Sequence, residues 1–465
     1  MKTLFIALIS VVLLDGTGDV FDKTRDLEGR YPVESRQRIE ITGFNGSDIT
    51  FRSWDKNEVF IKLAVRIESS DEEFERRYIE EVSIMESRSS AGLSIALREP
   101  RSSSRNGGFF SRIFRSSYVR KEIVGEIYVP QSNPLTTDMK YGTLSLENMK
   151  GTLKLLGGNN DLLLKNCTAL EDVRNDYGKT VIENSGGDLK LNSKSGKVTV
   201  EEFNGPVWID ADYSTIQVRK VHKEATINSK SATITIADIG GDLTVDADYS
   251  TLTVENVAGF FKVKNQSGKI RVKQIDGLSV DAPYTSVEAV DVSGKSGKEI
   301  TVRGQSGSLK LENAVGNLRI ENPYSKIELK NIKGSVDLST KSGRVTADGI
   351  QGDWTSNTEY SSLTILDLTA QAIRMTNKSN PIDLQLKNTP SIIDIKNEYG
   401  SVSVSMPTGF SGEVMLEATY GNVDTNLPVR SKSLGSGAYA TGKVGSGSGS
   451  ITIETKSAGI KLIQR

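Results

Sequence analysis

The amino-acid sequence predicts an all-β protein, a single-stranded right-handed parallel β-helix (β-solenoid) with about 18 residues per coil. The first observation is a fixed repeat, clearest from Tyr213 to Val280, in which apolar residues return at the same positions of every line. The second is that each line holds two alternations of apolar and variable residues, which is the periodicity of strands. The third is a glycine between the two alternations, which indicates a turn with positive φ or a close backbone approach.

Two other solenoid classes with coils of similar length do not fit this repeat. A left-handed helix of hexapeptides would space its apolar residues at regular hexapeptide intervals, and here the intervals are uneven. Calcium-binding β-rolls carry nonapeptides rich in glycine and aspartate, and the sequence has no such run. Right-handed crossovers are therefore expected.

Residues 1–18 are expected to form a secretory signal peptide. Lys2 precedes an apolar run, Leu4–Leu14, that is too short to cross a bilayer as a helix. We therefore expect export to the periplasm, the cell surface or the extracellular space of a bacterium. No later segment of the sequence is long and apolar enough to predict a transmembrane helix.

Changes in spacing divide the rest of the chain. Residues 36–134 are predicted to form an N-terminal β region that contains the first coil and an irregular basic insertion at 98–121. Residues 135–430 carry the regular coils, with a turn insertion at Lys295–Lys298. Residues 431–465 are predicted to form a loose Gly/Ser loop and then a terminal coil that ends the stack.

Several segments carry a family resemblance. They are I-E-I-T-G-F-N-G-S-D-I-T-F-R-S-W-D-K-N-E-V near the start, I-Y-V-P followed by Tyr141-Gly-Thr-Leu-Ser-Leu, and the terminal S-I-T-I-E-T-K-S-A-G-I-K-L. From Arg38 to the end, apart from the basic insertion, the chain resembles a bacterial β-strand-repeat family, a domain of unknown function to which an adhesin role is ascribed. The resemblance implies a secreted or envelope-located right-handed β-helix.

The composition offers little for catalysis, metals or nucleic acid. The 58 basic and 59 acidic residues are balanced, so no global positive field favours nucleic acid as a partner. The single cysteine, Cys167, excludes an internal disulfide, and its apolar slot predicts a buried thiol. The single histidine, His222, has no partner for a triad and is expected to be a solvated turn residue. No cofactor and no metal are predicted.

Carboxylates recur beside one slot of the repeat. Asp176, Asp212 and Asp248 each precede a tyrosine, and Lys194 and Lys230 occupy the same position in the coils between them. Opposite charges on neighbouring strands predict an alternating ladder of ion pairs. A metal or substrate site and a catalytic pair are the alternatives, because acids two coils apart would lie about 9.6 Å from each other, near the limit for glycosidases.

Tyrosines are the candidate ligand-binding residues, since they alternate with Ser or Asn in the slot that opens each coil. If they point outward, they form an aromatic stripe that can stack on sugar rings. If they lie at a corner, they pack over the neighbouring serine and seal the coil ends. The candidates are Tyr177, Tyr213, Tyr249, Tyr284, Tyr324 and Tyr360.

The basic insertion has two interpretations. It is either a disordered hairpin loop or a contact with an anionic surface, such as phospholipid head groups or an acidic glycan. In the second case its cations attract the surface and its phenylalanines insert at the boundary. The contact residues would be Arg105, Phe109, Phe110, Arg112, Phe114 and Arg115.

Together these observations predict a non-enzymatic exported β-solenoid that acts as an adhesin, an envelope scaffold or a ligand-binding protein. The expected partner is a glycan or an anionic envelope surface. The alternative is a polysaccharide-binding or polysaccharide-cleaving β-helix enzyme, which would need a cleft with clustered acids. A sensory accessory protein of the envelope is a third possibility that no residue distinguishes.

Overall fold

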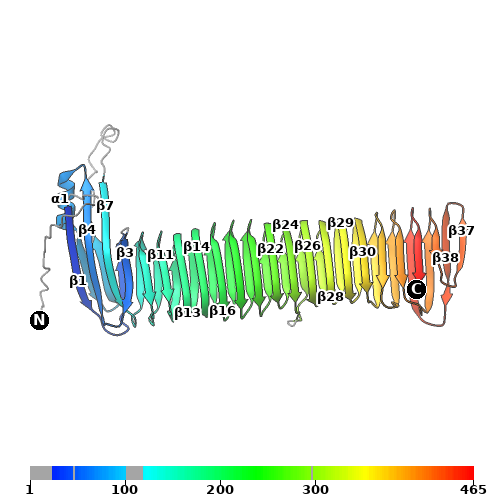
Figure 1. Cartoon of the computed structure of the whole chain (residues 1–465), viewed down its shortest axis with the longest axis horizontal. Coiled ribbons are helices and arrows are strands. Elements are labelled where there is room, and N and C mark those ends of the chain that lie inside the picture. The colour runs from blue at the N-terminus through cyan, green and yellow to red at the C-terminus, as the bar shows by residue number, and fades with distance from the viewer. Residues whose placement is uncertain (1–22, 46–47, 101–118, 295–296) are drawn as a thin grey trace. The chain divides into compact units, whose positions relative to one another are not determined.

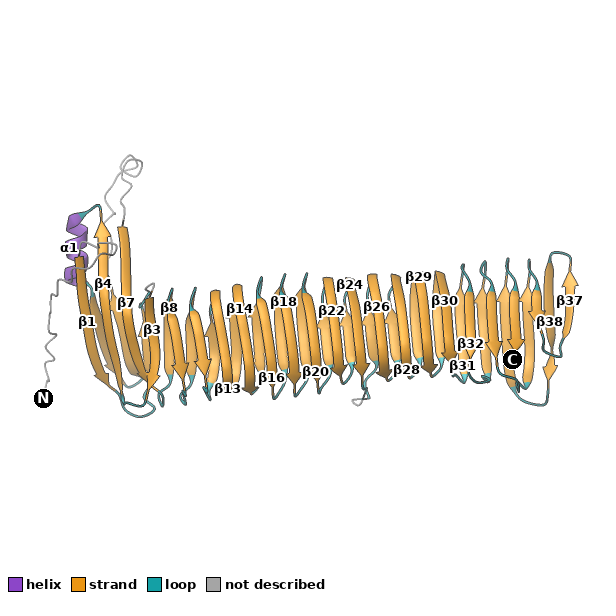
Figure 2. Ribbon diagram, viewed as in Figure 1, coloured by secondary structure: helices purple, strands orange, loops and turns teal. Residues whose placement is uncertain are grey.

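Strands dominate the structure, as the period-two alternation requires. The computed structural model describes residues 23–45, 48–100, 119–294 and 297–465. It is 70% strand with one helix among the described residues, and its β-solenoid has about 15 turns of about 18 residues (Figure 2). The predicted fold class is confirmed. The chain folds into two units, residues 1–223 and residues 224–465.

The first unit contains the helix α1 (Glu72–Glu81) and sixteen strands. They are β1 (Lys23–Pro32), β2 (Ile39–Thr42), β3 (Asp48–Trp54), β4 (Glu58–Ser69), β5 (Ser83–Ser89), β6 (Gly92–Arg98), β7 (Val119–Pro130), β8 (Leu135–Lys140), β9 (Thr143–Glu147), β10 (Leu153–Gly158), β11 (Asp161–Lys165), β12 (Leu170–Arg174), β13 (Tyr177–Ser193), β14 (Ser195–Asn204), β15 (Val207–Ala211) and β16 (Thr215–Val221).

The N-terminal strands of this unit mix parallel and antiparallel pairing (Figure 1). The coil β2–β3 lies between the strands β6 and β7 on one side and the first regular coil, β8–β9, on the other. Beyond β7, β4 and β1 continue the sheet in antiparallel order, and α1 contacts both. β1 lies before residue 36, where the β region was predicted to start. The repeat does not reveal this strand, because β1 pairs in antiparallel order with β4 and is not part of a coil. Such a cap covers the open edge of the first coils.

The second unit contains the strands β17 to β40. They are β17 (Ala225–Lys230), β18 (Thr233–Ile239), β19 (Leu243–Asp248), β20 (Thr251–Val257), β21 (Phe261–Lys264), β22 (Ser267–Ile275), β23 (Leu278–Asp281), β24 (Tyr284–Val292), β25 (Ile300–Arg303), β26 (Ser306–Val315), β27 (Leu318–Glu321), β28 (Tyr324–Lys333), β29 (Val336–Gln351), β30 (Trp354–Leu368), β31 (Ala372–Asn377), β32 (Ile382–Leu386), β33 (Ile392–Asn397), β34 (Val402–Met406), β35 (Gly412–Ala418), β36 (Val423–Thr425), β37 (Arg430–Leu434), β38 (Gly437–Val444), β39 (Gly449–Thr455) and β40 (Ile460–Gln464).

The register of the coils in this unit is the one that the repeat predicts. β18 pairs in parallel with β20, which places Ile236 beside Val254, and β20 pairs with β22, which places Val254 beside Val272. These inward side chains are buried, whereas Thr253, which precedes Val254 on β20, is exposed. Burial of one face of each strand drives the coiling, because the apolar rows of successive coils form a continuous core.

The predicted turn insertion lies between β24 and β25. The Gly297 N–H donates a hydrogen bond to the Gly294 carbonyl over 3.1 Å, and residues 295 and 296 lie outside the described residues. After the insertion, Val302 lies beside Val280 and Ile300 lies beside Leu318. The extra residues therefore lengthen a turn without shifting the core register.

The C-terminal end differs from the prediction in two respects. β39 lies between β33 and β35, and β40 lies between β34 and β36, so the last coil is inserted into the stack and does not end it. The predicted loose loop over 431–450 is also wrong, since β37 and β38 form an antiparallel hairpin and β38 pairs with β35. Backbone hydrogen bonds hold this Gly/Ser-rich segment, and the small side chain of Ala440 is fully buried in it.

A second corner of each coil places one residue in the left-handed region. The slot is filled mainly by asparagine and aspartate, which tolerate positive φ better than other side chains. In the first unit Asn148, Asn166 and Asn184 have φ of 58°, 53° and 43°. The Asn166 amide donates to Asn148 Oδ1 over 3.0 Å, and the Asn184 amide donates to Asn166 Oδ1 over 2.7 Å. The sequence repeat contains the corresponding signal, an Asn or Asp seven residues after most coils open.

The glycine between the two strands of a coil has two explanations. Gly187, within β13, has a positive φ of 132°, and a Cβ there would also lie 2.3 Å from the Leu170 carbonyl oxygen. Gly259 lies outside the left-handed region, but a Cβ there would be 2.4 Å from Asp242 Oδ1 and 2.6 Å from the Gly241 carbonyl oxygen. At Gly259 the glycine is therefore explained by the close approach of the neighbouring backbone.

We expect Gly259→Val to destabilise the protein by about 1–3 kcal/mol, because the Gly241 backbone must move to admit the side chain. Urea unfolding of the purified protein measures the change. Gly158→Ala is the control, since its Cβ would meet only the Asp176 Cβ, at an ordinary 3.7 Å. Equal unfolding midpoints for both variants would contradict the close approach at Gly259.

Candidate functional site

The tyrosines that open alternate coils form an exposed row within each unit, and together these residues are here named the tyrosine ladder. Their side chains are exposed by 49% at Tyr177 to 66% at Tyr213, which is the outward of the two orientations that the sequence allowed. The ladder includes all the candidate tyrosines and three others that occupy the same slot. Its members are Tyr141, Tyr177 and Tyr213 in the first unit, and Tyr249, Tyr284, Tyr324, Tyr360, Tyr399 and Tyr420 in the second.

The ladder is regular because the coils are in register. Tyr177 lies beside Ser195 in the first unit, and Tyr324 lies beside Ser306 in the second. Parallel strands are about 4.8 Å apart, so tyrosines on alternate coils recur about every 9.6 Å. The intervening serines are smaller than the tyrosines, and the tyrosine side chains remain at least 49% exposed.

The inserted C-terminal coil continues this alternation. The Ser457 N–H donates a hydrogen bond to the Glu398 carbonyl, and the Tyr420 N–H donates one to the Lys456 carbonyl. Ser457 therefore lies between Tyr399 and Tyr420 in space, although it follows both in the sequence. The tyrosine–serine order is lost in the sequence after Tyr399, because Tyr420 follows it directly, but the order is preserved in the fold.

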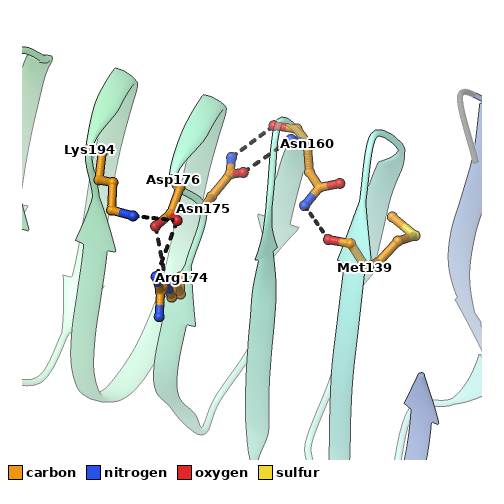
Figure 3. A network of polar contacts seen from close by, with 6 residues as sticks. All are labelled: Met139, Asn160, Arg174, Asn175, Asp176 and Lys194. Atoms are coloured by element: carbon orange, nitrogen blue, oxygen red, sulfur yellow. Dashed lines mark hydrogen bonds and ion pairs between the residues drawn. The ribbon is translucent and has the colours of Figure 1, made fainter. Parts of the chain in front are cut away.

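Backbone geometry and buried amides fix the corner at which the ladder residues lie. Tyr249 and Ser231 have φ of 54° and 53°, which turns the chain sharply at this slot. At the corner shown in Figure 3, the buried Asn175 amide donates to the Asn160 carbonyl over 2.8 Å, and its carbonyl oxygen accepts from the Asn160 N–H over 3.1 Å. Asn265 donates to the Ser250 carbonyl in the same way over 2.9 Å. The Asn160 and Ser250 carbonyls also accept the N–H groups of Lys179 and Lys269, so the asparagine amides add a second hydrogen bond that ties the turn to the strand.

Sequence reasoning missed these corner asparagines. The signal that could have found them is an asparagine two residues before the slot that opens the coil, at Asn175, Asn265, Asn322, Asn377 and Asn397. All of them are buried. A buried position in a solenoid is otherwise filled by an apolar side chain. The buried asparagines therefore indicate that the turn backbone needs a side-chain hydrogen-bond partner at this position.

The predicted charge ladder is present at one rung. Asp176 accepts from Arg174 Nε over 3.0 Å and from Lys194 Nζ over 3.1 Å (Figure 3). The hydrogen bond from Arg174 is the largest cause that holds the pKa of Asp176 below its ordinary value. Lys230 and Asp248 are neighbours on β17 and β19, but no ion pair joins them in the part of the chain that the structure describes, so the ladder is not repeated there.

The other candidate groups lie apart from one another. His222 is exposed at a turn, where its N–H donates to the Phe203 carbonyl. Cys167 is buried, as predicted, and burial raises the pKa of its thiol to about 11. A thiol with this pKa stays protonated at neutral pH and is a weak nucleophile.

The described residues were also compared with the requirements of a metal site and of a membrane-spanning helix. Within the described ranges, no group of three or more His, Cys, Asp or Glu side chains is placed to hold a metal ion. None of the helices in those ranges has the length and apolar character needed to cross a membrane. The predicted signal peptide at 1–18 and the predicted surface-contact residues Arg105, Phe109, Phe110, Arg112, Phe114 and Arg115 lie outside the described residues.

The fold and the ladder define a class of protein, a β-solenoid that displays a regular row of exposed aromatic side chains. Residues 278–462 match the family model described as Toastrack DUF4097. This match confirms, over those residues, the resemblance to a β-strand-repeat domain of unknown function.

Among solved structures, the chain is similar to a protein from Clostridium sporogenes ATCC 15579 that is provisionally described as a cell adhesion protein. The two are 10% identical, with a TM-score of 0.16, and the likeness covers 95% of this chain and 100% of that one. No curated protein matches the sequence.

Proposed function

We propose that this protein is a non-enzymatic, exported adhesive β-solenoid whose tyrosine ladder holds an extended polysaccharide along the coil axis. The observation that carries the proposal is the exposure of every ladder tyrosine on alternate coils that are in register within each unit. Tyrosine rings offer rigid, amphipathic contact area at low cost in side-chain entropy. A spacing of about 9.6 Å is close to the length of one extended disaccharide unit, so successive rings can stack on every second sugar.

Adhesion follows from the repetition of weak contacts. A single ring stacked on one sugar would bind weakly, but contacts along one polymer add through their high effective concentration. The state of the carboxylate beside Tyr177 supports sugar binding over sugar cleavage. Asp176 forms ion pairs with Arg174 and Lys194, which stabilise its charged form. A catalytic acid would instead need a raised pKa and a free path to the glycosidic oxygen.

The test is binding of the purified protein to a polysaccharide array and then to the best polymer in solution. In one variant Tyr249, Tyr284, Tyr324 and Tyr360 are changed to serine. Serine already occupies this slot at Ser231, with nearly the same φ as Tyr249, so the fold should tolerate the changes. We expect a loss of affinity of about 100-fold, equivalent to about 0.7 kcal/mol per ring.

The matched control replaces the same four tyrosines by phenylalanine, which keeps the rings and should retain most of the affinity. Unchanged binding by the serine variant, or no binding of the wild-type protein to any polymer, would contradict the proposal. Release of new reducing ends from the bound polymer would instead favour the enzyme alternative.

A further inference from the structure

A shallow cavity of about 430 Å³ lies in the second unit beside the tyrosine ladder. It occupies the face of β22, β24, β26 and β28, immediately after the slots of Tyr284 and Tyr324. We name it the notch. Its polar lining consists of Lys269, Ser286, Glu288, Ser308, Lys310, Lys326 and Glu328.

The notch exists because two successive coils carry a short side chain in one slot. Lys269 lies beside Ser286, and Ser308 lies beside Lys326, in the slot two residues after the ladder. Two serines between two lysines therefore leave a gap about two coils wide, or about 10 Å along the stack. Ser286 and Ser308 line this gap together with the adjacent Val287 and Leu309, which are buried.

The charges around the notch are not fully compensated. Lys310 Nζ lies 3.4 Å from Glu288 Oε1, and Lys326 forms an ion pair with Glu328. Lys269 is half-buried, and no carboxylate lies within 4.0 Å of its ammonium group among the described residues. Its neighbours across the strands are Thr251 and Ser286, which carry no charge. One end of the notch therefore presents an ammonium group that an anion can approach.

We infer that the notch binds an acidic sugar residue of the polysaccharide that the ladder holds, with the sugar carboxylate on Lys269 Nζ. This inference rests on the proposed function. The hydroxyls of Ser286 and Ser308 meet the sugar hydroxyls, and Tyr284 and Tyr324 stack on the same polymer. An anionic polymer is favoured over a neutral one because the charge-assisted hydrogen bond to Lys269 is available only to a carboxylate.

The experiment compares polygalacturonate with the same polymer after full methyl esterification, which removes the charge and keeps the sugar chain. Binding of both polymers is measured for the wild-type protein and for Lys269→Gln. Lys262→Gln is the control, because Lys262 is an exposed lysine on β21 that does not line the notch. We expect the wild type to bind the acidic polymer about 10-fold more tightly, which is about 1.4 kcal/mol.

Lys269→Gln should abolish this preference and leave the binding of the esterified polymer unchanged, and Lys262→Gln should keep the preference. A higher salt concentration should weaken the binding of the acidic polymer only, because salt screens the interaction between its carboxylates and Lys269. Equal binding of both polymers by the wild type, or a preference retained in Lys269→Gln, would overturn the inference and leave the proposed function standing. Equal affinity for free galacturonate and for the polymer would also overturn it, since the notch would then be a small-acid site. Failure of the wild type to bind either polymer would also overturn the inference, whereas the proposed function would fall only if no polymer of the array were bound.

Discussion

Val254→Asp should destabilise the protein by about 3–5 kcal/mol, because it places an unpaired carboxylate inside the stack. Val254 is 1% exposed and lies between Ile236 and Val272 of the neighbouring coils. None of these neighbours can satisfy a charge, and each coil of a solenoid depends on the coils beside it. Urea unfolding followed by circular dichroism measures the change.

The control is Thr253→Asp, one residue away on the same strand. Thr253 is exposed and lies beside Arg271, so a carboxylate there stays in water next to a cation. We expect a change within about 0.5 kcal/mol, as for most surface substitutions. Comparable stability of the two variants would show that the inward register of this strand is wrong.

Deletion of residues 449–465 should have the second large effect, since it removes a coil from within the stack. β33 and β34 would lose a parallel partner, and β35 and β36 would lose their parallel pairing with β39 and β40. Exposed strand edges promote association between chains. We expect sedimentation velocity to detect oligomers and aggregates of the truncated chain, and thermal unfolding to begin at a lower temperature.

A synthetic peptide of residues 449–465, added in trans, provides the control for this truncation. It should bind the truncated protein and reduce its association, because the open edges are complementary to the missing strands. A truncated chain that stays monomeric and unfolds like the wild type would mean that β35–β36 stacks directly on β33–β34. In that case the inserted position of the last coil would not be needed for stability.

The candidate site was predicted only in part. The slot of the tyrosine ladder could be found from the repeat, but its direction could not, because the turn at this slot differs between coils. Tyr213 and Tyr249 have positive φ, whereas Tyr324 begins β28 without it and follows the strand alternation. The buried asparagines beside the ladder were missed, since their role is to satisfy backbone groups that appear only once the turn is built. The notch depends on which side chains neighbour one another across β22, β24, β26 and β28.

The sequence by itself determined the fold class, the coil length and the inward residues. These follow from a local rule, because a residue such as Ile236 or Val254 is buried by its own strand's alternation in every coil. The tertiary structure decided which coils are neighbours at the two ends of the chain. Parallel pairing is made by backbone groups that are the same in every coil, so the order of β33, β39 and β35 carries no local signal. The same reason explains why a Gly/Ser-rich segment forms the hairpin β37–β38, whose strands are held by the backbone of their neighbours.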